Sequence, residues 1–251
     1  MFALFTSETH TERSPLPAAS AMNLRALLGA AAWSRLPQPV QRRFGIAHTE
    51  ATYCGRMELR CSRMGRIFAA LARCWGGPLT GISAADSPAT VRVTHNGRGG
   101  VVWERCFHDD DTTSGRAPQR HGQTIRSTKE LDADGRLLER TEGGLSMLLD
   151  VFEENGALVF QSRRYLWVLP GRRLRVRIPL LLTPGTCRVV HTDLGGGNFR
   201  FTLTMDHPWW GQTFYQSGVF ADPHLEGGEG CGRVRAMPPH GSMRDATSGI
   251  D

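Results

Sequence analysis

The stretch LSMLLDVFEENGALVFQSRRYLWVL, residues 145–169, decides the fold. Asn155-Gly156 separates two runs that are rich in aliphatic and aromatic residues. This dipeptide favours a two-residue type I′ turn, which needs positive φ at both central positions. The turn predicts a hairpin in which Glu154 pairs with Ala157 and the pairing continues outward from there. Polar residues lie among the apolar ones, so the hairpin favours a sheet that wraps around a partly wet interior.

Charge and composition suit one globular domain with loose ends. The chain has 30 Lys and Arg against 24 Asp and Glu, a formal net charge of +6. Lys129 is the only lysine, and we attribute this skew to the codon bias of an Arg-rich genome. Basic residues alternate with acidic ones and form no stripe along a helix, which argues against nucleic-acid binding.

The cysteines and the N-terminal residues predict a cytoplasmic protein. The six cysteines form no C-x-x-C pair and match no zinc spacing, so we expect reduced, mostly buried thiols. The first residues, MFALFTSETHTERSP, lack the basic region and apolar core of a secretory signal. No apolar run approaches the roughly 20 residues of a membrane span, so we expect none.

The spacing of apolar residues predicts both helices and strands along the chain. Asn23 can cap a helix that runs through Ala31, and a second helix is expected over residues 63–75. One face of the second helix carries Met64, Ile67, Phe68, Leu71 and Trp75. Strands are expected at residues 51–61, 90–95, 101–107, 123–131, 136–142, 145–154, 157–169, 186–193, 198–206 and 213–220, with an irregular crossover at 170–184.

Consecutive hairpins after N-terminal helices predict an α+β fold. The helices would pack on a strongly curved antiparallel β-meander, in the form of a half-barrel or incomplete barrel. The second helix is expected on its mouth or concave face. A single α+β domain would span residues 22–220, with a disordered lead at 1–21 and a disordered tail at 221–251.

Three short stretches stand in an order that resembles a known family. They are WERCF at residues 103–107, LER at 138–140, and HPWWG at 207–211 followed by Tyr215 and Gly218. With the segment MGRIFAALARCWGGP after the first strand, they resemble the bacterial family called domain of unknown function 4166, over residues 36–220. The resemblance implies members that stand alone or are fused behind dinucleotide-binding, reductase-like domains. It implies a fold-level grouping and no established activity.

Arg105 is the candidate with the strongest physical argument. Alternation places Trp103, Arg105 and Phe107 on one face of their strand, where an unpaired arginine costs several kcal/mol to bury. As a structural ion pair it would meet Glu139 or Asp150, and Arg105→Ala would then cost about 3–5 kcal/mol. As an anion or carboxylate clamp it would serve a ligand, and its loss would abolish binding without changing the melting temperature.

Three further groups have two interpretations each. Glu104 and Glu139 would serve acid–base chemistry only if the fold brought them within reach. His207 could act as a general base near neutral pH, or could close a turn before Pro208. The HDDD run at residues 108–111 could hold a divalent cation, but it lacks the glycine and final carboxylate of a calcium loop. A solvated acidic loop fits better, and no metal is expected.

No G-x-S-x-G, H-E-x-x-H, G-x-x-x-x-G-K or dinucleotide-binding G-x-G-x-x-G motif in a strand–helix unit occurs, so we expect no cofactor. The leading hypothesis is a non-catalytic binding module for a small amphipathic or lipid-like ligand. The ligand-binding candidates are Trp103, Arg105, Glu139, Asp150, His207 and Tyr215.

The alternative is an enzyme of unknown reaction, or a regulatory module that partners a dinucleotide-binding reductase. Catalysis would be favoured if one cavity contained two or more of Arg105, Glu104, Glu139, Asp150 and His207. Scattering of these side chains over separate surfaces would exclude it.

Overall fold

The computed structural model describes residues 22–45, 50–73, 79–108, 123–168 and 175–223. The expected lead at 1–21 lies outside these residues, and so do the expected tail beyond residue 223 and Asp109 to Asp111 of the acidic run.

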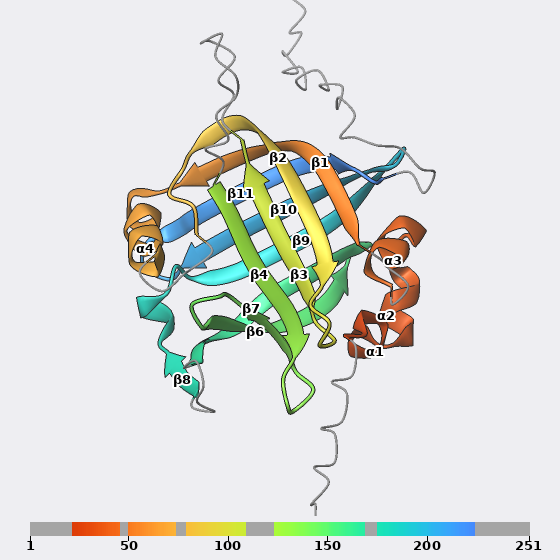
Figure 1. The fold of residues 1–251 in the computed structure, drawn as a ribbon, viewed down its shortest axis with the longest axis horizontal. Coiled ribbons are helices and arrows are strands. Elements are labelled where there is room, and N and C mark those ends of the chain that lie inside the picture. The colour runs from red at the N-terminus through yellow and green to blue at the C-terminus, as the bar shows by residue number, and fades with distance from the viewer. Residues whose placement is uncertain (1–21, 46–49, 74–78, 109–122, 169–174, 224–251) are drawn as a thin grey trace, which may run out of the picture.

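Within the described residues, ten strands form one closed antiparallel barrel (Figure 1). They are β1 (Ala51–Cys61), β2 (Ala84–His95), β3 (Val101–Phe107), β4 (Gln123–Leu131), β5 (Leu137–Arg140), β6 (Leu145–Glu154), β7 (Ala157–Val168), β9 (Thr186–Gly195), β10 (Asn198–His207) and β11 (Gly211–Ala221). Each strand pairs with the next of these along the chain, so the expected antiparallel meander is confirmed.

The expected α+β half-barrel is wrong, because the first and last strands meet. β1 pairs with β11 over seven residues, from Gly55 opposite Phe220 to Cys61 opposite Phe214. This pairing closes the ring and leaves no unpaired edge among the ten strands, which removes a site for aggregation. The described residues are mostly strand, with short helices at the ends of a barrel.

Two glycines make the closing contact sterically feasible. Gly55 and Gly218 face inward, opposite Phe220 and Met57 respectively. A Cβ on Gly55 would lie 2.2 Å from the carbonyl oxygen of Val219, and one on Gly218 would lie 2.5 Å from Met57 Cγ. The glycines thus leave room for the buried Phe220 and Met57 side chains at the seam, as isolated strand glycines often do.

The Asn155-Gly156 hairpin is confirmed. β6 and β7 pair from Glu154 with Ala157 to Asp150 with Gln161, in the register that the two-residue turn predicts. Asn155 has a φ of 52° and Gly156 a φ of 78°, as a type I′ turn requires. Within the expected crossover, a short strand β8 (Arg175–Ile178) pairs with β7 outside the ring, and a 3-10 turn η1 (Leu180–Leu182) follows it.

Helices lie at both ends of the barrel (Figure 1). At one end are α1 (Leu24–Leu28), α2 (Ala30–Arg35) and α3 (Gln38–Phe44). The Asn23 carboxamide accepts a hydrogen bond from the Ala26 N–H at 3.1 Å, so the expected N-cap is confirmed. The helix that was expected to continue through Ala31 is interrupted at Gly29, whose φ is 80°.

At the other end, α4 (Arg63–Arg73) packs on β1 and β11. A Cβ on Gly65 would lie 2.3 Å from the Thr213 carbonyl oxygen, so this helix touches the β11 backbone directly. The expected buried face is only partly right, because Ile67 and Leu71 are each 50 % exposed. No helix among the described residues has the length and apolar character needed to cross a membrane.

Candidate functional site in the barrel interior

Neighbouring strands place a buried ion cluster inside the barrel. β3 contributes Arg105, β4 contributes Ser127 and Lys129, and β5 contributes Glu139, and all four residues are buried. Lys129 Nζ lies 3.1 Å from Glu139 Oε2, and the Ser127 hydroxyl donates to Glu139 Oε1 at 2.7 Å. The alternation of β4 explains the arrangement, because Ile125, Ser127 and Lys129 all point inward.

Arg105 is the one member of this cluster without a direct bond to the carboxylate. No hydrogen bond or ion pair joins it to a carboxylate in the described part of the chain, and its Nε has no hydrogen-bond partner there. Burial lowers the pKa of Arg105, and the Glu139 charge opposes part of that effect. The structural pair expected between Arg105 and Glu139 is therefore wrong as a direct bond, since Lys129 takes that place.

Glu139 is held in its ionised form. Burial alone would raise the pKa of this carboxyl, but Lys129, Arg105 and the Ser127 hydroxyl together hold it below its ordinary value. The cluster then contains two cationic side chains and one carboxylate. A buried excess of positive charge is costly unless something compensates for it.

Five buried polar atoms without a hydrogen-bond partner among the described residues belong to side chains around one cavity of about 40 Å³. They are Arg43 Nη1, Trp103 Nε1, Arg105 Nε, His191 Nδ1 and Gln216 Oε1. Buried polar atoms in native proteins normally have partners, so five around one space point to a site for a polar group. We call this space the interior cavity.

Arg43 enters the interior cavity from α3. Its Nε and Nη2 donate to the two carboxylate oxygens of Asp222 at 2.9 and 2.6 Å, which leaves Nη1 without a partner. The guanidinium carbon lies 3.8 Å from the centroid of the Phe199 ring. This ion pair anchors the chain just after β11 to the helical end of the barrel.

His191 lies in an aromatic cage beside the cluster. Its ring centroid is 4.8 Å from that of Phe44, 5.6 Å from Trp103 and 5.4 Å from Phe201. Burial, followed by the charges of Arg43, Lys129 and Arg105, lowers the pKa of His191 well below 6.5. The imidazole is therefore neutral at physiological pH and adds no charge to the cavity.

Two further cavities adjoin the interior cavity. One of about 80 Å³ lies toward α1 and α3 and shares Arg43, Trp103 and Lys129 with it. The other, of about 340 Å³, lies beneath α4 and has an almost wholly apolar lining that includes Phe68, Leu71, Leu145, Trp167 and Leu182. Leu79 lines both this space, which we call the apolar pocket, and the interior cavity. A cavity that contains charged side chains and an almost wholly apolar pocket thus meet at Leu79.

A family model described as Domain of unknown function (DUF4166) matches residues 36–220, which include α3 and nearly all of the barrel. The chain belongs to this family. The resemblance that the sequence motifs suggested is thereby confirmed. A search of curated proteins finds no match to the chain.

In this DUF4166 domain, three of the six candidate residues come together. Trp103, Arg105 and Glu139 all line the interior cavity. Asp150 does not join them, because it is exposed and its carboxylate lies 3.7 Å from Arg163 on the outside of the barrel. The expectation that Asp150 could be a buried partner of Arg105 is therefore wrong.

Glu104 lies on the opposite face of β3 from Arg105. Its cross-strand neighbours are Arg92 on β2 and Arg126 on β4, both exposed. Glu104 and Glu139 consequently form no carboxylate pair.

His207 closes the turn between β10 and β11. Its Nδ1 accepts from the backbone N–H groups of Trp209 and Trp210 at 3.1 and 3.3 Å. This acceptance assigns the ring proton to Nε2, which donates to the Leu181 carbonyl at 3.3 Å. All the imidazole's hydrogen-bonding capacity is used for the turn, as the structural interpretation of His207 requires.

Tyr215 faces outward on β11, where its ring lies 5.4 Å from the guanidinium carbon of Arg60. It lines none of the three cavities. Among the described cysteines, Cys61, Cys106 and Cys187 are free, whereas Cys54 is disulfide-bonded, so the expectation of reduced thiols is wrong for Cys54.

Among the polar residues that line the interior cavity, Arg43, Ser127, Lys129, His191 and Gln216 were not expected from the sequence. Lys129 carried a usable signal. Lys129 is the only lysine in the chain, whereas the arginines are numerous. It also lies on the same face of its predicted strand as Ile125 and Ser127. We attributed this skew to codon bias, which explains the arginines and not the lysine. His191 and Gln216 carried no such signal, because isolated histidines and glutamines are common on strands.

Proposed function

We propose that the barrel is a non-catalytic binding module that holds one small amphipathic, lipid-like ligand, with an anionic end in the interior cavity. The observation that carries the proposal is the set of five buried polar atoms without partners among the described residues, all on side chains that line that cavity. A ligand in the cavity would supply the missing bonds. The fold suits this role, since barrels of this size can enclose a small molecule.

The charges favour an anionic group, such as a carboxylate. Arg105, Arg43 and Trp103 each present an N–H that can only donate. Glu139 offsets one of the two cations in the cluster, and Asp222 already pairs with Arg43. A carboxylate beside Arg105 would balance the remaining positive charge and accept from its planar guanidinium.

The apolar pocket favours an attached hydrophobic group. The interior cavity has room for little more than a polar head, since a single water needs about 10–15 Å³ by the same measure. The apolar pocket is several times larger and lies on the other side of Leu79. A hydrocarbon or aromatic tail would fill it, provided that Leu79 moves aside.

Catalysis remains the second candidate, because Arg105 and Glu139 do converge in one cavity and so meet the condition set from the sequence. Glu139 is a poor proton acceptor, however, because both of its oxygens are engaged and its pKa is lowered. His207, the other acid–base candidate, is committed to its turn. A binding site that performs no reaction needs neither a free proton acceptor nor a free imidazole, so it agrees better with the engaged Glu139 and His207.

The test is a ligand series in matched pairs, measured by native mass spectrometry and thermal shift. Fatty acids, isoprenoid acids and aromatic acids are each compared with the corresponding alcohol. We expect one ligand per chain and a larger rise in melting temperature with the acid. Equal binding of acid and alcohol would reject the anionic end, and no binding at all would reject the binding module.

A variant pair tests the apolar pocket. Ala72 is buried and lines this pocket, so Ala72→Phe should fill it and weaken long-chain ligands more than short ones. Ala70→Phe places the same ring on the exposed side of α4 and should leave binding unchanged. If both variants bind long chains as well as the unmodified protein does, the tail lies elsewhere.

A further inference from the structure

Large apolar side chains are exposed around the α4 end of the barrel. They include Ile67 and Leu71 on α4, Leu181 and Leu182 on η1, and Trp209 and Trp210 on the turn between β10 and β11. Leu182 is 71 % exposed and Trp209 is 68 % exposed. We call these six residues the α4-end face. Single exposed apolar residues are ordinary, but a group of this kind marks a surface that interacts with something.

Contacts through His207 and the apolar pocket show that these residues form one face. The His207 ring stacks on Phe68 of α4 at 5.8 Å between centroids, and its Nε2 donates to the carbonyl of Leu181. The same ring lies about 6 Å from the rings of Trp209 and Trp210. Leu71 and Leu182 both line the apolar pocket, so this pocket lies within the face. Figure 1 shows α4 at the end of the barrel opposite α1 to α3.

The charges around this face are mainly positive. α4 carries three exposed arginines, Arg63, Arg66 and Arg73, and has no acidic residue. Arg177 on β8 is also exposed. None of the four takes part in an ion pair within the described residues. Asp206, beside the turn, is the exposed carboxylate nearest in sequence to the two tryptophans.

We propose that the α4-end face docks on the surface of an anionic phospholipid bilayer. The leucine and tryptophan side chains would enter the boundary between headgroups and acyl chains, where tryptophan is favoured. The arginines would lie against lipid phosphates, to which a guanidinium donates well. A second copy of the chain fits the face poorly, because the arginines of one copy would oppose those of the other. The apolar pocket would then open toward the bilayer, the natural source of an amphipathic ligand, although docking itself does not depend on the proposed function.

The experiment measures sedimentation of the full chain with vesicles of phosphatidylcholine alone and of phosphatidylcholine mixed with phosphatidylserine. We expect binding to the mixed vesicles, weaker binding in high salt, and a blue shift of tryptophan fluorescence. Arg63→Gln with Arg73→Gln should lower vesicle binding about 25-fold, since each arginine near an anionic surface contributes on the order of fivefold. Leu182→Ser with Trp209→Ser should reduce the blue shift, because Trp210 alone remains in the face, and should lower binding at least about tenfold.

Matched controls lie at the opposite end of the barrel. Arg25 and Arg42 are exposed there, so Arg25→Gln with Arg42→Gln makes the same change in charge. Leu194 is an exposed leucine on the hairpin between β9 and β10, which makes Leu194→Ser the control for apolar loss. Both controls should bind vesicles as the unmodified protein does.

Three outcomes would overturn the proposal. The protein does not sediment with anionic vesicles, or the charge variants at both ends lose binding equally, or the chain forms a dimer that Leu182→Ser with Trp209→Ser dissociates. The last outcome would assign the face to a second copy. Circular dichroism of every variant shows whether the barrel is intact. Replacement should leave the core in place, because the changed positions are all exposed, namely Leu182, Trp209, Arg63 and Arg73.

Discussion

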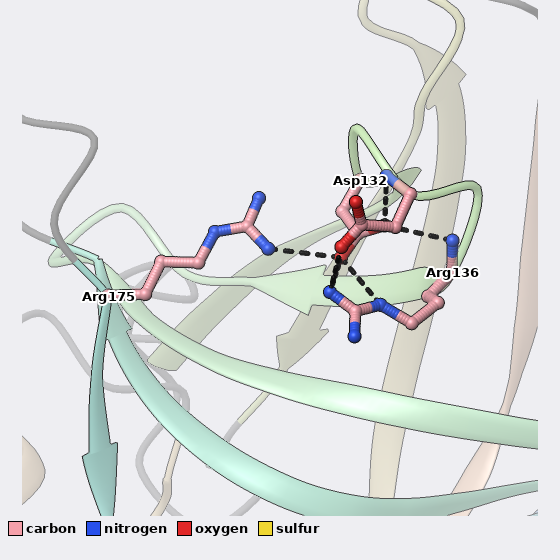
Figure 2. Close-up of polar contacts among 4 residues, drawn as sticks. Asp132, Arg136 and Arg175 are labelled. Carbon is pink, nitrogen blue, oxygen red and sulfur yellow. Dashed lines mark hydrogen bonds and ion pairs between the residues drawn. The ribbon is translucent and has the colours of Figure 1, made fainter.

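Two charged clusters of this barrel, the turn at Asp132 and the interior cluster around Glu139, differ in how fully their polar atoms are satisfied. In the turn between β4 and β5, Asp132 accepts from the backbone N–H groups of Asp134 and Arg136 at 3.0 and 2.9 Å. Its other oxygen accepts from the guanidinium groups of Arg136 and Arg175, at 2.9 and 3.0 Å (Figure 2). Both arginines remain partly exposed, so water can reach their remaining N–H groups.

The interior cluster has the opposite character. Glu139 is bonded to Ser127 and Lys129, but Arg105 beside it is buried and has no carboxylate of its own. A structural network gains most when every member is satisfied, as the turn at Asp132 shows. The same residue types therefore satisfy one another in the turn, whereas in the interior they leave hydrogen-bonding groups without partners among the described residues.

The largest expected effect comes from removing the interior carboxylate. Glu139→Ala should lower the free energy of unfolding by about 3–5 kcal/mol, because Lys129 and Arg105 would stay buried without a counter-ion. Urea unfolding at neutral pH, followed by tryptophan fluorescence, measures the change.

The matched control is Asp132→Ala in the turn. The Asp132 side chain is itself buried, but both arginines that it pairs with stay partly exposed and can regain water, so its loss should be smaller, about 1–2 kcal/mol. Equal losses at the two sites would mean that the interior cluster is as well solvated as the turn, and the contrast between them would be lost.

A middle-sized effect should appear in the pH dependence of stability. The folded barrel keeps His191 neutral, whereas the unfolded chain takes up a proton there below about pH 6.5. Because the folded pKa is lowered, the stability that depends on neutral His191 is full above that pH and falls as the pH drops. The loss approaches about 1.4 kcal/mol for each pH unit.

His191→Phe keeps an aromatic ring in the cage and should make the slope between neutral and mildly acidic pH shallower. His108→Gln is the control, because His108 is exposed on the edge of the barrel wall. Unfolding free energies at constant ionic strength give both slopes. An unchanged slope in His191→Phe would show that His191 is hydrated in the folded state.

Local features of the sequence predicted much of this fold. Asn155-Gly156 fixed one hairpin and its register, since the turn type depends on two residues only. Closure was not predictable in the same way, because it depends on residues at the two ends of the domain. Gly55 and Gly218 are the signals that could have suggested it, each being an isolated glycine within a predicted strand.

The sequence predicted which way some candidate residues face, but it did not predict which residues they meet. Alternation correctly placed Arg105 inside, because one strand decides which face a residue takes. The partner of Glu139 depends on the register between β4 and β5, where Lys129 lies opposite Glu139. Asp150 failed as a partner because it lies on the outward phase of β6. Pairing across strands is a property of the assembled sheet, and sequence spacing alone does not fix it.

The smallest expected effect on stability belongs to Arg105, and it is the most informative. A directly paired Arg105 would cost about 3–5 kcal/mol when lost. With Lys129 bonded to Glu139 instead, Arg105→Met removes a buried cation that has no direct partner and fills its place with an apolar chain. The free energy of unfolding should then change by less than about 1 kcal/mol, or rise, as often happens when hydrophobic residues replace buried charges.

In the ligand series, Arg105→Met should lose the preference for acids over alcohols. Arg105→Lys should keep only part of that preference, because an ammonium lacks the planar fork of donors. A variant that unfolds readily would return Arg105 to a structural role. A variant that is stable and still prefers acids would move the anion site toward Arg43, whose Nη1 also lacks a partner among the described residues.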